Sequence, residues 1–190
     1  MRRFSKSQHI EIAGRQLRIN NTVNQGCYCE ILEDLFNQMS AMLSHHSRLL
    51  FIRFDLHCNK FTQDNKIMSD WMRLLKRKLK RFYGFSRIGY LWVRERQKAE
   101  HQHYHLVLIL DGNKVQHPSN IFGIAKQACY QHKVPAPYVP KNSYYKISRG
   151  DSESFDTAYY RGSYLAKSRS KRKDLARSFG SSNIRPRNED

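Results

Sequence analysis

Two apolar segments that lie close together in the sequence constrain the fold more than any other feature. Residues 88–95 read IGYLWVRE, residues 103–110 read HYHLVLIL, and only a short polar stretch separates them. Both segments are rich in the β-branched and aromatic residues that favour strands. Because a connection this short joins neighbouring antiparallel strands, the sequence predicts an antiparallel hairpin in the middle of the chain.

Further elements are predicted on either side of this hairpin. Apolar residues recur at helical spacing over 28–43 and 67–82, and Gly84 ends the second of these helices. The segment LLFIRFDLH at 49–57 alternates like a strand after an apolar start. The remaining predicted elements are a short strand within 11–19, a helix at 121–131, a short strand at 144–148 and a helix at 154–167.

The predicted order along the chain is strand, helix, strand, strand, helix, strand, with one helix before this series and one after it. We therefore expect an α+β fold, with a ferredoxin-like antiparallel sheet, helices on one face of it and an additional N-terminal helix. The expected divisions are an N-terminal extension over 1–47, one compact domain over 48–182 and a flexible tail over 183–190.

The charge balance indicates a polyanionic partner. The chain has 34 Lys and Arg against 16 Asp and Glu, a net charge of +18 and a pI near 10.0. Nucleic acid is the commonest polyanion that attracts such a surplus. A basic protein that binds acidic surfaces without specificity has the same composition, so the charge alone does not choose between the two.

Membrane insertion and secretion are not expected. No stretch approaches the roughly 18 apolar residues that span a membrane. Met1-Arg2-Arg3 precedes polar residues rather than an apolar core, so the sequence does not indicate a secretory signal. We expect the protein to act in the cytoplasm, without a membrane partner.

Two histidines near the start of the second hairpin strand form a candidate metal site. His103 and His105 alternate with Tyr104, so both imidazoles project from the same face of a strand and can bind one divalent cation. A polar strand end at which histidines meet water is the alternative. Glu95, at the end of the partner strand, is a candidate third ligand, and an exposed charge there is equally expected. His101 and, more weakly, Glu100 compete for the third position.

A tyrosine in the helix at 154–167 is a candidate nucleophile. Tyr160, Tyr164 and Lys167 fall at i, i+4 and i+7 and share one helix face, whereas Tyr159 lies on the stripe expected to pack against the sheet. A phenol has an ordinary pKa of about 10, so it needs help to attack a phosphate. Lys167, one turn from Tyr164, can supply that help. If this helix is considered by itself, the default interpretation is that Tyr164 faces solvent beside a lysine and has no catalytic role.

These motifs, in this order, resemble those of HUH endonucleases. The pair of histidines around one hydrophobic residue matches His103-Tyr104-His105, and the nucleophile motif Tyr-x-x-Lys matches Tyr164-Leu165-Ala166-Lys167. The segments FDLH, WVRE, HYHLVLILDG, SYLAKSRSK and RSFGSS are similar to replication initiators of filamentous phages and prophages, of the inovirus gene II type. The resemblance covers roughly residues 45–182.

The resemblance implies a ferredoxin-like palm with the histidines on a central strand, and nicking of one DNA strand with Mg²⁺ or Mn²⁺. The tyrosine would become linked to the 5′ phosphate and leave a free 3′ hydroxyl, which primes rolling-circle replication in the cytoplasm of a bacterial host. Some relatives have a second tyrosine one helical turn after the first, on the carboxyl side of the Tyr-x-x-Lys motif. Ser168 occupies that position here, and Tyr160 is the candidate substitute. The chain has no room for a helicase domain, so a host helicase is an implied partner.

The DNA contacts are expected on basic side chains. The charge run on the helix at 67–82 most often means a solvated face, and a contact with the DNA backbone is the second interpretation. The predicted DNA-binding residues are Arg73, Lys76, Arg77, Lys80, Arg161, Arg169, Lys171 and Arg172. A non-catalytic DNA-binding protein of a phage or prophage, and a nonspecific nucleic-acid-binding module, are the alternative functions.

Overall fold

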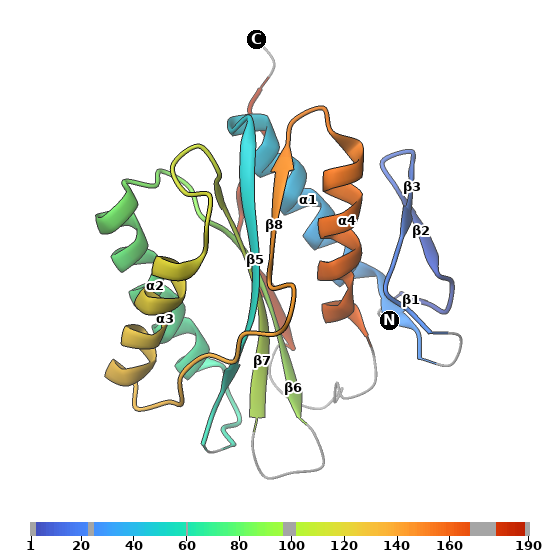
Figure 1. The fold of residues 1–190 in the computed structure, drawn as a ribbon. Helices are drawn as coiled ribbons and strands as arrows, with labels where there is room; N and C mark the ends of the chain where they lie inside the picture. The colour runs from blue at the N-terminus through green and yellow to red at the C-terminus, as the bar shows by residue number, and fades with distance from the viewer. Residues whose placement is uncertain (1–2, 23–24, 60, 97–101, 168–177, 189–190) are drawn as a thin grey trace.

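The computed structural model describes residues 3–22, 25–59, 61–96, 102–167 and 178–188. A five-stranded antiparallel sheet lies between two pairs of helices (Figure 1). Its strands follow the order β8-β5-β7-β6-β9. They span Arg48–His57 (β5), Gly89–Arg96 (β6), Gln102–Asp111 (β7), Tyr144–Ser148 (β8) and Phe179–Ser181 (β9).

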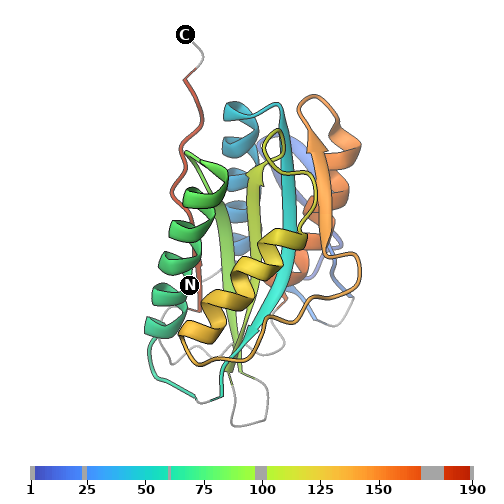
Figure 2. The same ribbon diagram turned by 60° about the vertical axis from the view of Figure 1, so that its left-hand side comes forward.

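The predicted order of strand, helix, strand, strand, helix, strand is confirmed by β5, α2 (Lys66–Tyr83), β6, β7, α3 (Ser119–Gln131) and β8. Helices α2 and α3 pack together on one face of the sheet (Figure 2). Strand β7 lies at the centre and pairs with β5 on one side and with the hairpin partner β6 on the other. The element that carries the histidine pair is therefore the most enclosed strand of the sheet.

Helices cover both faces of the sheet, so the prediction that they pack on one face is wrong. Helices α1 (Cys29–His45) and α4 (Ser152–Ser163) cover the second face. The reason lies in β5, where Leu50 and Ile52 face α2 and α3 while Leu49 and Phe51 face α1 and α4. A strand that is apolar on both sides must be covered on both sides to bury its side chains.

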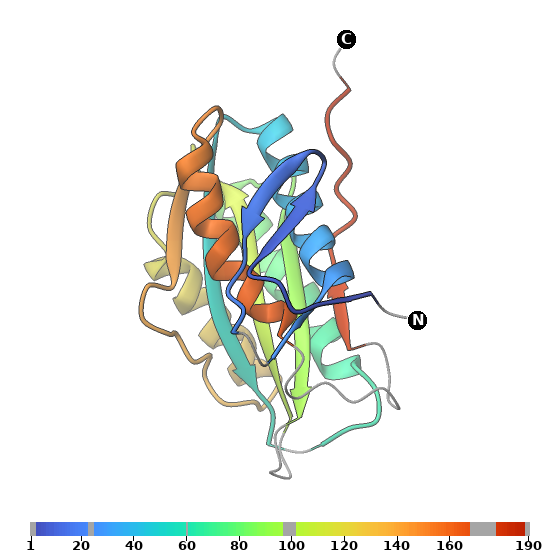
Figure 3. The ribbon, with the colours of Figure 1, turned by 90° about the vertical axis from the view of Figure 1, so that its right-hand side faces the viewer.

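The N-terminal residues pack onto the second helical layer. Strands β2 (His9–Ile12) and β3 (Arg15–Arg18) form an antiparallel hairpin beside α4 (Figure 3). Arg15 forms an ion pair with Asp156 of α4 at 2.7 Å. Two shorter strands, β1 (Phe4–Ser5) and β4 (Cys27–Tyr28), pair with each other just before α1. The extension predicted over 1–47 thus shares the core beneath α1 and α4.

The C-terminal residues contain a strand that was not predicted. Strand β9 adds to the edge of the sheet by pairing with β6, with Phe179 opposite Val93. The chain then follows α1, where the Arg187 amide donates to the Ser44 hydroxyl at 2.8 Å. Residues 168–177 lie outside the described residues. None of the helices in the described part of the chain has both the length and the hydropathy to cross a bilayer.

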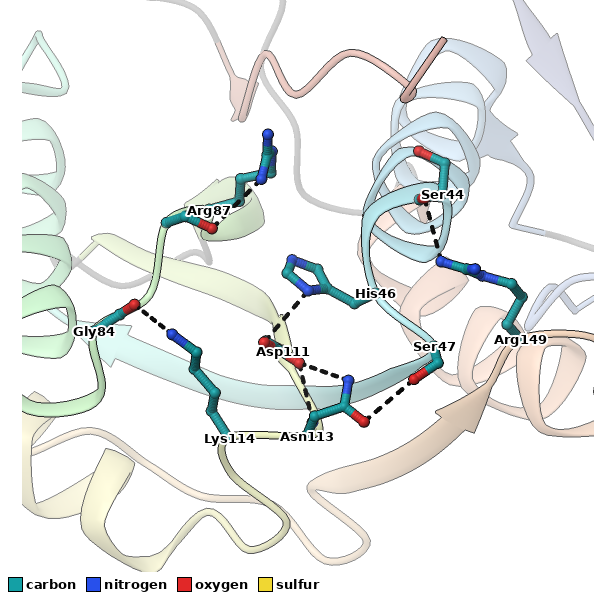
Figure 4. A network of polar contacts seen from close by, with 10 residues as sticks. Ser44, His46, Ser47, Gly84, Arg87, Asp111, Asn113, Lys114 and Arg149 are labelled. Atoms are coloured by element: carbon teal, nitrogen blue, oxygen red, sulfur yellow. Dashed lines mark hydrogen bonds and ion pairs between the residues drawn. The ribbon is translucent and has the colours of Figure 1, made fainter. Parts of the chain in front are cut away.

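A polar network joins the connections at one end of the sheet (Figure 4). His46 Nδ1 lies 3.3 Å from Asp111 Oδ2, and the Ser47 hydroxyl donates to the side-chain oxygen of Asn113 at 3.2 Å. Lys114 donates to the carbonyl of Gly84, the C-cap residue of α2, at 2.6 Å. The histidine pair lies at the opposite end of β7, where β6 and β7 meet the loop that joins them.

Candidate metal centre and active site

The histidine pair lies where three strands meet. On β7, His103 is opposite His57 of β5 and Glu95 of β6, and His105 is opposite Asp55 of β5. Tyr104 is fully buried in the core beneath α2 and α3. His103 and His105 therefore share the other face, as the alternation predicted.

Glu95 completes a cluster with the two histidines. Its Oε2 lies 3.0 Å from His105 Nε2 and 3.8 Å from His103 Nε2, and one ligand atom from each of the three residues lies within 4.8 Å of the other two. Neighbouring ligands that are each about 2.1 Å from one Mg²⁺ lie about 3.0 Å apart. The two separations from Glu95 therefore fall between about 3.0 Å for adjacent ligands and about 4.2 Å for opposite ligands of one ion. The competing candidates His101 and Glu100 lie outside the described residues.

His105 is oriented by a second carboxylate. Its Nδ1 lies 2.7 Å from Asp55 Oδ1, so Nδ1–H donates to Asp55 and the ring directs Nε2 toward Glu95. Nε2 is buried and lies 3.0 Å from Glu95 Oε2. A carboxylate–histidine pair of this kind fixes a metal ligand from behind.

The electrostatics of this group favour a positive charge at Nε2. Burial lowers the pKa of His105, but the hydrogen bonds and charges of Asp55 and Glu95 outweigh burial and raise the pKa to about 9. Either a proton at Nε2 or a bound cation can thus offset negative charge of the two buried carboxylates. Two imidazole nitrogens and one carboxylate oxygen form a donor set that suits Mg²⁺ or Mn²⁺ while leaving positions for water and phosphate.

Tyr164 lies against this cluster. The α-helix ends at Ser163, and Tyr164 opens a 3-10 turn, η1 (Tyr164–Ala166), so the continuous helix predicted over 154–167 is wrong in its last turn. The ring of Tyr164 contacts the ring of His105 edge to face, with centroids 5.7 Å apart and an angle of 82° between the planes. Lys167 Nζ lies 4.8 Å from the Tyr164 ring centroid. The structure therefore brings Tyr164 to the histidine pair and places Lys167 beside the Tyr164 ring.

The other two tyrosines of α4 have different surroundings. The guanidinium of Arg18, on β3, lies over the ring of Tyr160 at 5.2 Å. Tyr159 is fully buried, and its hydroxyl donates to the carbonyl of Leu32 at 3.2 Å. The structure thus supports the predicted packing of Tyr159, and it places Tyr160 next to the N-terminal hairpin.

Two charged residues of β5, Arg53 and Asp55, belong to the site but were not among the residues predicted for it. Arg53 is only 5% exposed, its guanidinium lies 4.4 Å over the Tyr164 ring, and one of its terminal nitrogens lies 3.8 Å from Asp55 Oδ1. Burial lowers the pKa of Arg53, and its Nε has no hydrogen-bond partner among the described residues. The signal was in LLFIRFDLH, where Arg53, Asp55 and His57 alternate on one side of an otherwise apolar strand.

The predicted DNA-binding residues of α2 lie on the opposite face of the sheet from the cluster. Arg77 and Lys80 are exposed there, and Arg73 forms an ion pair with Asp70. Lys76 is half-buried over the ring of Tyr90, and burial lowers its pKa. The structure does not bring these four residues to the Tyr164 site.

Among the predicted DNA-binding residues that the structure describes, Arg161 lies nearest this site. It lies on α4, three residues before Tyr164, and donates to the carbonyl of Lys141 at 2.9 Å. Its charge is close enough to Arg53 to lower the pKa of that guanidinium further. The other predicted contacts, Arg169, Lys171 and Arg172, lie outside the described residues.

Comparison with known proteins identifies a family. The family model described as the YagK/YfjJ C-terminal domain matches residues 14–182, which include the histidine pair, Glu95 and Tyr164. No curated protein and no solved structure matches the chain significantly. Because the match extends over most of the sequence, the chain belongs to the YagK/YfjJ C-terminal domain family, which is associated with prophages.

Proposed function

We propose that this protein is a metal-dependent DNA nicking enzyme of the HUH type that initiates rolling-circle replication. The observation that carries the proposal is the contact between Tyr164 and His105, a residue of the histidine pair on the central strand. A phenol beside two imidazoles and a buried carboxylate is the arrangement that a tyrosine transesterase needs. The strand order β8-β5-β7-β6, with α2 and α3 on one face, supports a ferredoxin-like palm beneath this site.

His103, His105 and Glu95 would hold Mg²⁺ or Mn²⁺. The buried Nε2 of His105, 3.0 Å from Glu95 Oε2, and the mixed nitrogen and oxygen donors of the cluster fit such an ion. When bound, the ion would act as a Lewis acid that polarises the scissile phosphate. Asp55 would hold His105 in its ligating orientation through the 2.7 Å contact with Nδ1.

Tyr164 would be the nucleophile. Its phenolic oxygen forms a bond with the phosphorus as its proton passes to solvent, the bond between phosphorus and the 3′ oxygen breaks, and the 3′ oxygen takes up a proton. The products are a 5′-phosphotyrosyl adduct and a free 3′ hydroxyl. One phosphodiester replaces another, so no further reactant is required. Arg53 and Lys167 flank the ring and can stabilise the negative charge of the transferred phosphate.

The wider properties of the chain support DNA as the substrate. The net charge of +18 favours a polyanion, and the prophage association of the family is consistent with the replication of a mobile element. In this proposal the protein acts in the cytoplasm of a bacterial host on single-stranded or origin DNA, and a host helicase unwinds the duplex.

A covalent adduct tests the proposal. The protein would be incubated with Mn²⁺ and a single-stranded DNA pool that contains a randomised segment, labelled at its 3′ end. We expect a labelled adduct that survives a denaturing gel and that EDTA abolishes, because the tyrosine retains the 5′ phosphate of the downstream fragment. The same pool labelled at its 5′ end should give a shortened free strand.

Absence of the adduct with either Mg²⁺ or Mn²⁺, together with retained DNA binding, would contradict the enzyme and favour the non-catalytic DNA-binding protein. A 5′ label that remains on the protein would show the opposite polarity of cleavage, and it would contradict the proposed chemistry while leaving the enzyme class intact.

A further inference from the structure

We infer that Tyr138 and His57 form a stacking platform for a nucleobase of single-stranded DNA beside the metal cluster. The inference rests on the proposed function in one respect only, that the ligand is DNA. It does not depend on the nicking reaction. Tyr138 belongs to the connection between α3 and β8, and its side chain is 57% exposed. More than half of this side chain is therefore accessible to a ligand.

The backbone of Tyr138 is held against the site strand. The Asp55 amide donates to the Tyr138 carbonyl at 2.8 Å, and the Tyr138 amide donates to the Asp55 carbonyl at 2.9 Å. Pro137 and Pro140 restrict the backbone on either side. The backbone of Tyr138 is thus held next to the residue that orients His105, by contacts that do not involve the Tyr138 side chain.

The ring of Tyr138 continues a row of aromatic rings. It lies 6.2 Å from the ring of His57, which in turn stacks on His103 at 5.4 Å with an angle of 29° between the planes. At the other end of the row, Tyr164 contacts His105. The metal-ligating histidines therefore lie between Tyr138 and the nucleophile. A strand whose scissile phosphate is bound at the cluster would place a neighbouring base over Tyr138 and His57.

Base stacking suits this surface. Stacking on an aromatic side chain is tolerant of sequence and contributes about 1–3 kcal/mol per base. His57 is exposed, and its ring lies 6.2 Å from that of Tyr138. The two rings therefore offer polarisable area next to a site for the phosphate backbone.

The test is the affinity for single-stranded DNA in the presence of EDTA, so that neither metal binding nor nicking contributes. Fluorescence anisotropy would compare wild type, Tyr138→Phe and Tyr138→Ala on an oligothymidylate and on an oligonucleotide of the same length with abasic sites. Tyr130→Ala is the matched control, because Tyr130 is 86% exposed on α3, which packs on the opposite face of the sheet.

We expect Tyr138→Ala to weaken binding of the oligothymidylate about 5- to 140-fold. Tyr138→Phe and Tyr130→Ala should stay within a factor of about two of wild type, because the Phe ring still stacks and Tyr130 lies outside the site. Tyr138→Ala should also discriminate less than wild type between the normal and the abasic strand. Equal affinities and equal discrimination in wild type and Tyr138→Ala would overturn the inference, whether or not the adduct forms. Confirmed stacking without an adduct would instead contradict only the nicking activity.

Discussion

The ring of Tyr164 contacts the ring of His105 edge to face, with the ring centroids 5.7 Å apart. His105 belongs to the central strand, and Tyr164 begins the 3-10 turn that follows α4. The contact therefore depends on how closely the end of α4 approaches the sheet. A change in that packing should move the proposed nucleophile relative to the proposed metal ligands.

Gly162 sets this approach. A Cβ atom at this position would lie 2.8 Å from Phe51 Cζ and 2.9 Å from Leu35 Cδ2, and both of these side chains are buried. We expect Gly162→Ala to lower the free energy of unfolding by about 1–3 kcal/mol, because overpacking displaces α4. Urea denaturation measures the change.

Gly123→Ala is the matched control for this prediction. Gly123 lies within α3, and a Cβ atom there meets nothing within 4 Å. This change should stabilise the protein by about 0.5–1 kcal/mol, because alanine has the higher helix propensity. Similar stability changes in the two variants would show that α4 does not need glycine for its approach to the sheet.

Asp55 should control metal affinity without being a ligand. Asp55→Asn removes the carboxylate behind His105 Nδ1, and we expect Mn²⁺ affinity to fall about 10- to 100-fold in isothermal titration calorimetry. The matched control is Asp111→Asn, because Asp111 pairs with His46 at the other end of the sheet (Figure 4). If both variants bind Mn²⁺ like wild type, Asp55 does not support a metal ligand.

The histidine pair should be necessary for nicking but not for DNA affinity. The double change His103→Ala with His105→Ala removes two of three ligands, so the adduct should disappear while binding of single-stranded DNA in EDTA stays within a few-fold of wild type. Glu95→Gln should raise the Mn²⁺ concentration needed for nicking, and His101→Ala should have the milder effect. A double variant that nicks at the wild-type rate would disprove the metal site.

The affinity for DNA should fall steeply with salt, because each contacted phosphate of a single strand changes the slope of log K against log salt by about 0.7. If the exposed face of α2 contacts the backbone, Arg77→Gln with Lys80→Gln should reduce this slope by ~1.4. Arg73→Gln should change it less, because Asp70 already pairs with Arg73. An unchanged slope in the double variant would identify this face as merely solvated.

Short-range patterns predicted much of the fold. The alternation of His103 and His105 around Tyr104 correctly placed both imidazoles on one face, because the side-chain period of a strand is fixed by its backbone. The hairpin likewise brought Glu95 to His103, because a short connection fixes the register. Both inferences needed only residues that are near one another in the sequence.

Features that depend on distant pairing could not be predicted. Asp55 lies fifty residues before His105, and only the pairing of β5 with β7 makes them partners. Arg53 reaches Tyr164 for the same reason, across more than one hundred residues. The edge strand β9 has three residues, too few for periodicity to reveal, and exists because the unpaired side of β6 accepts it.

The residue that becomes linked to DNA tests the central claim most directly. Cleavage after Lys and Arg separates the tyrosines, since residues 150–161 contain Tyr159 and Tyr160 and residues 162–167 contain Tyr164. After nuclease digestion of the purified adduct, mass spectrometry should find the nucleotide phosphate on 162–167. Tyr164→Phe should form no adduct, and Tyr160→Phe should form it normally and lose at most a second transfer. Recovery of the modification on 150–161, or full adduct formation by Tyr164→Phe, would contradict the assignment of Tyr164 as the nucleophile.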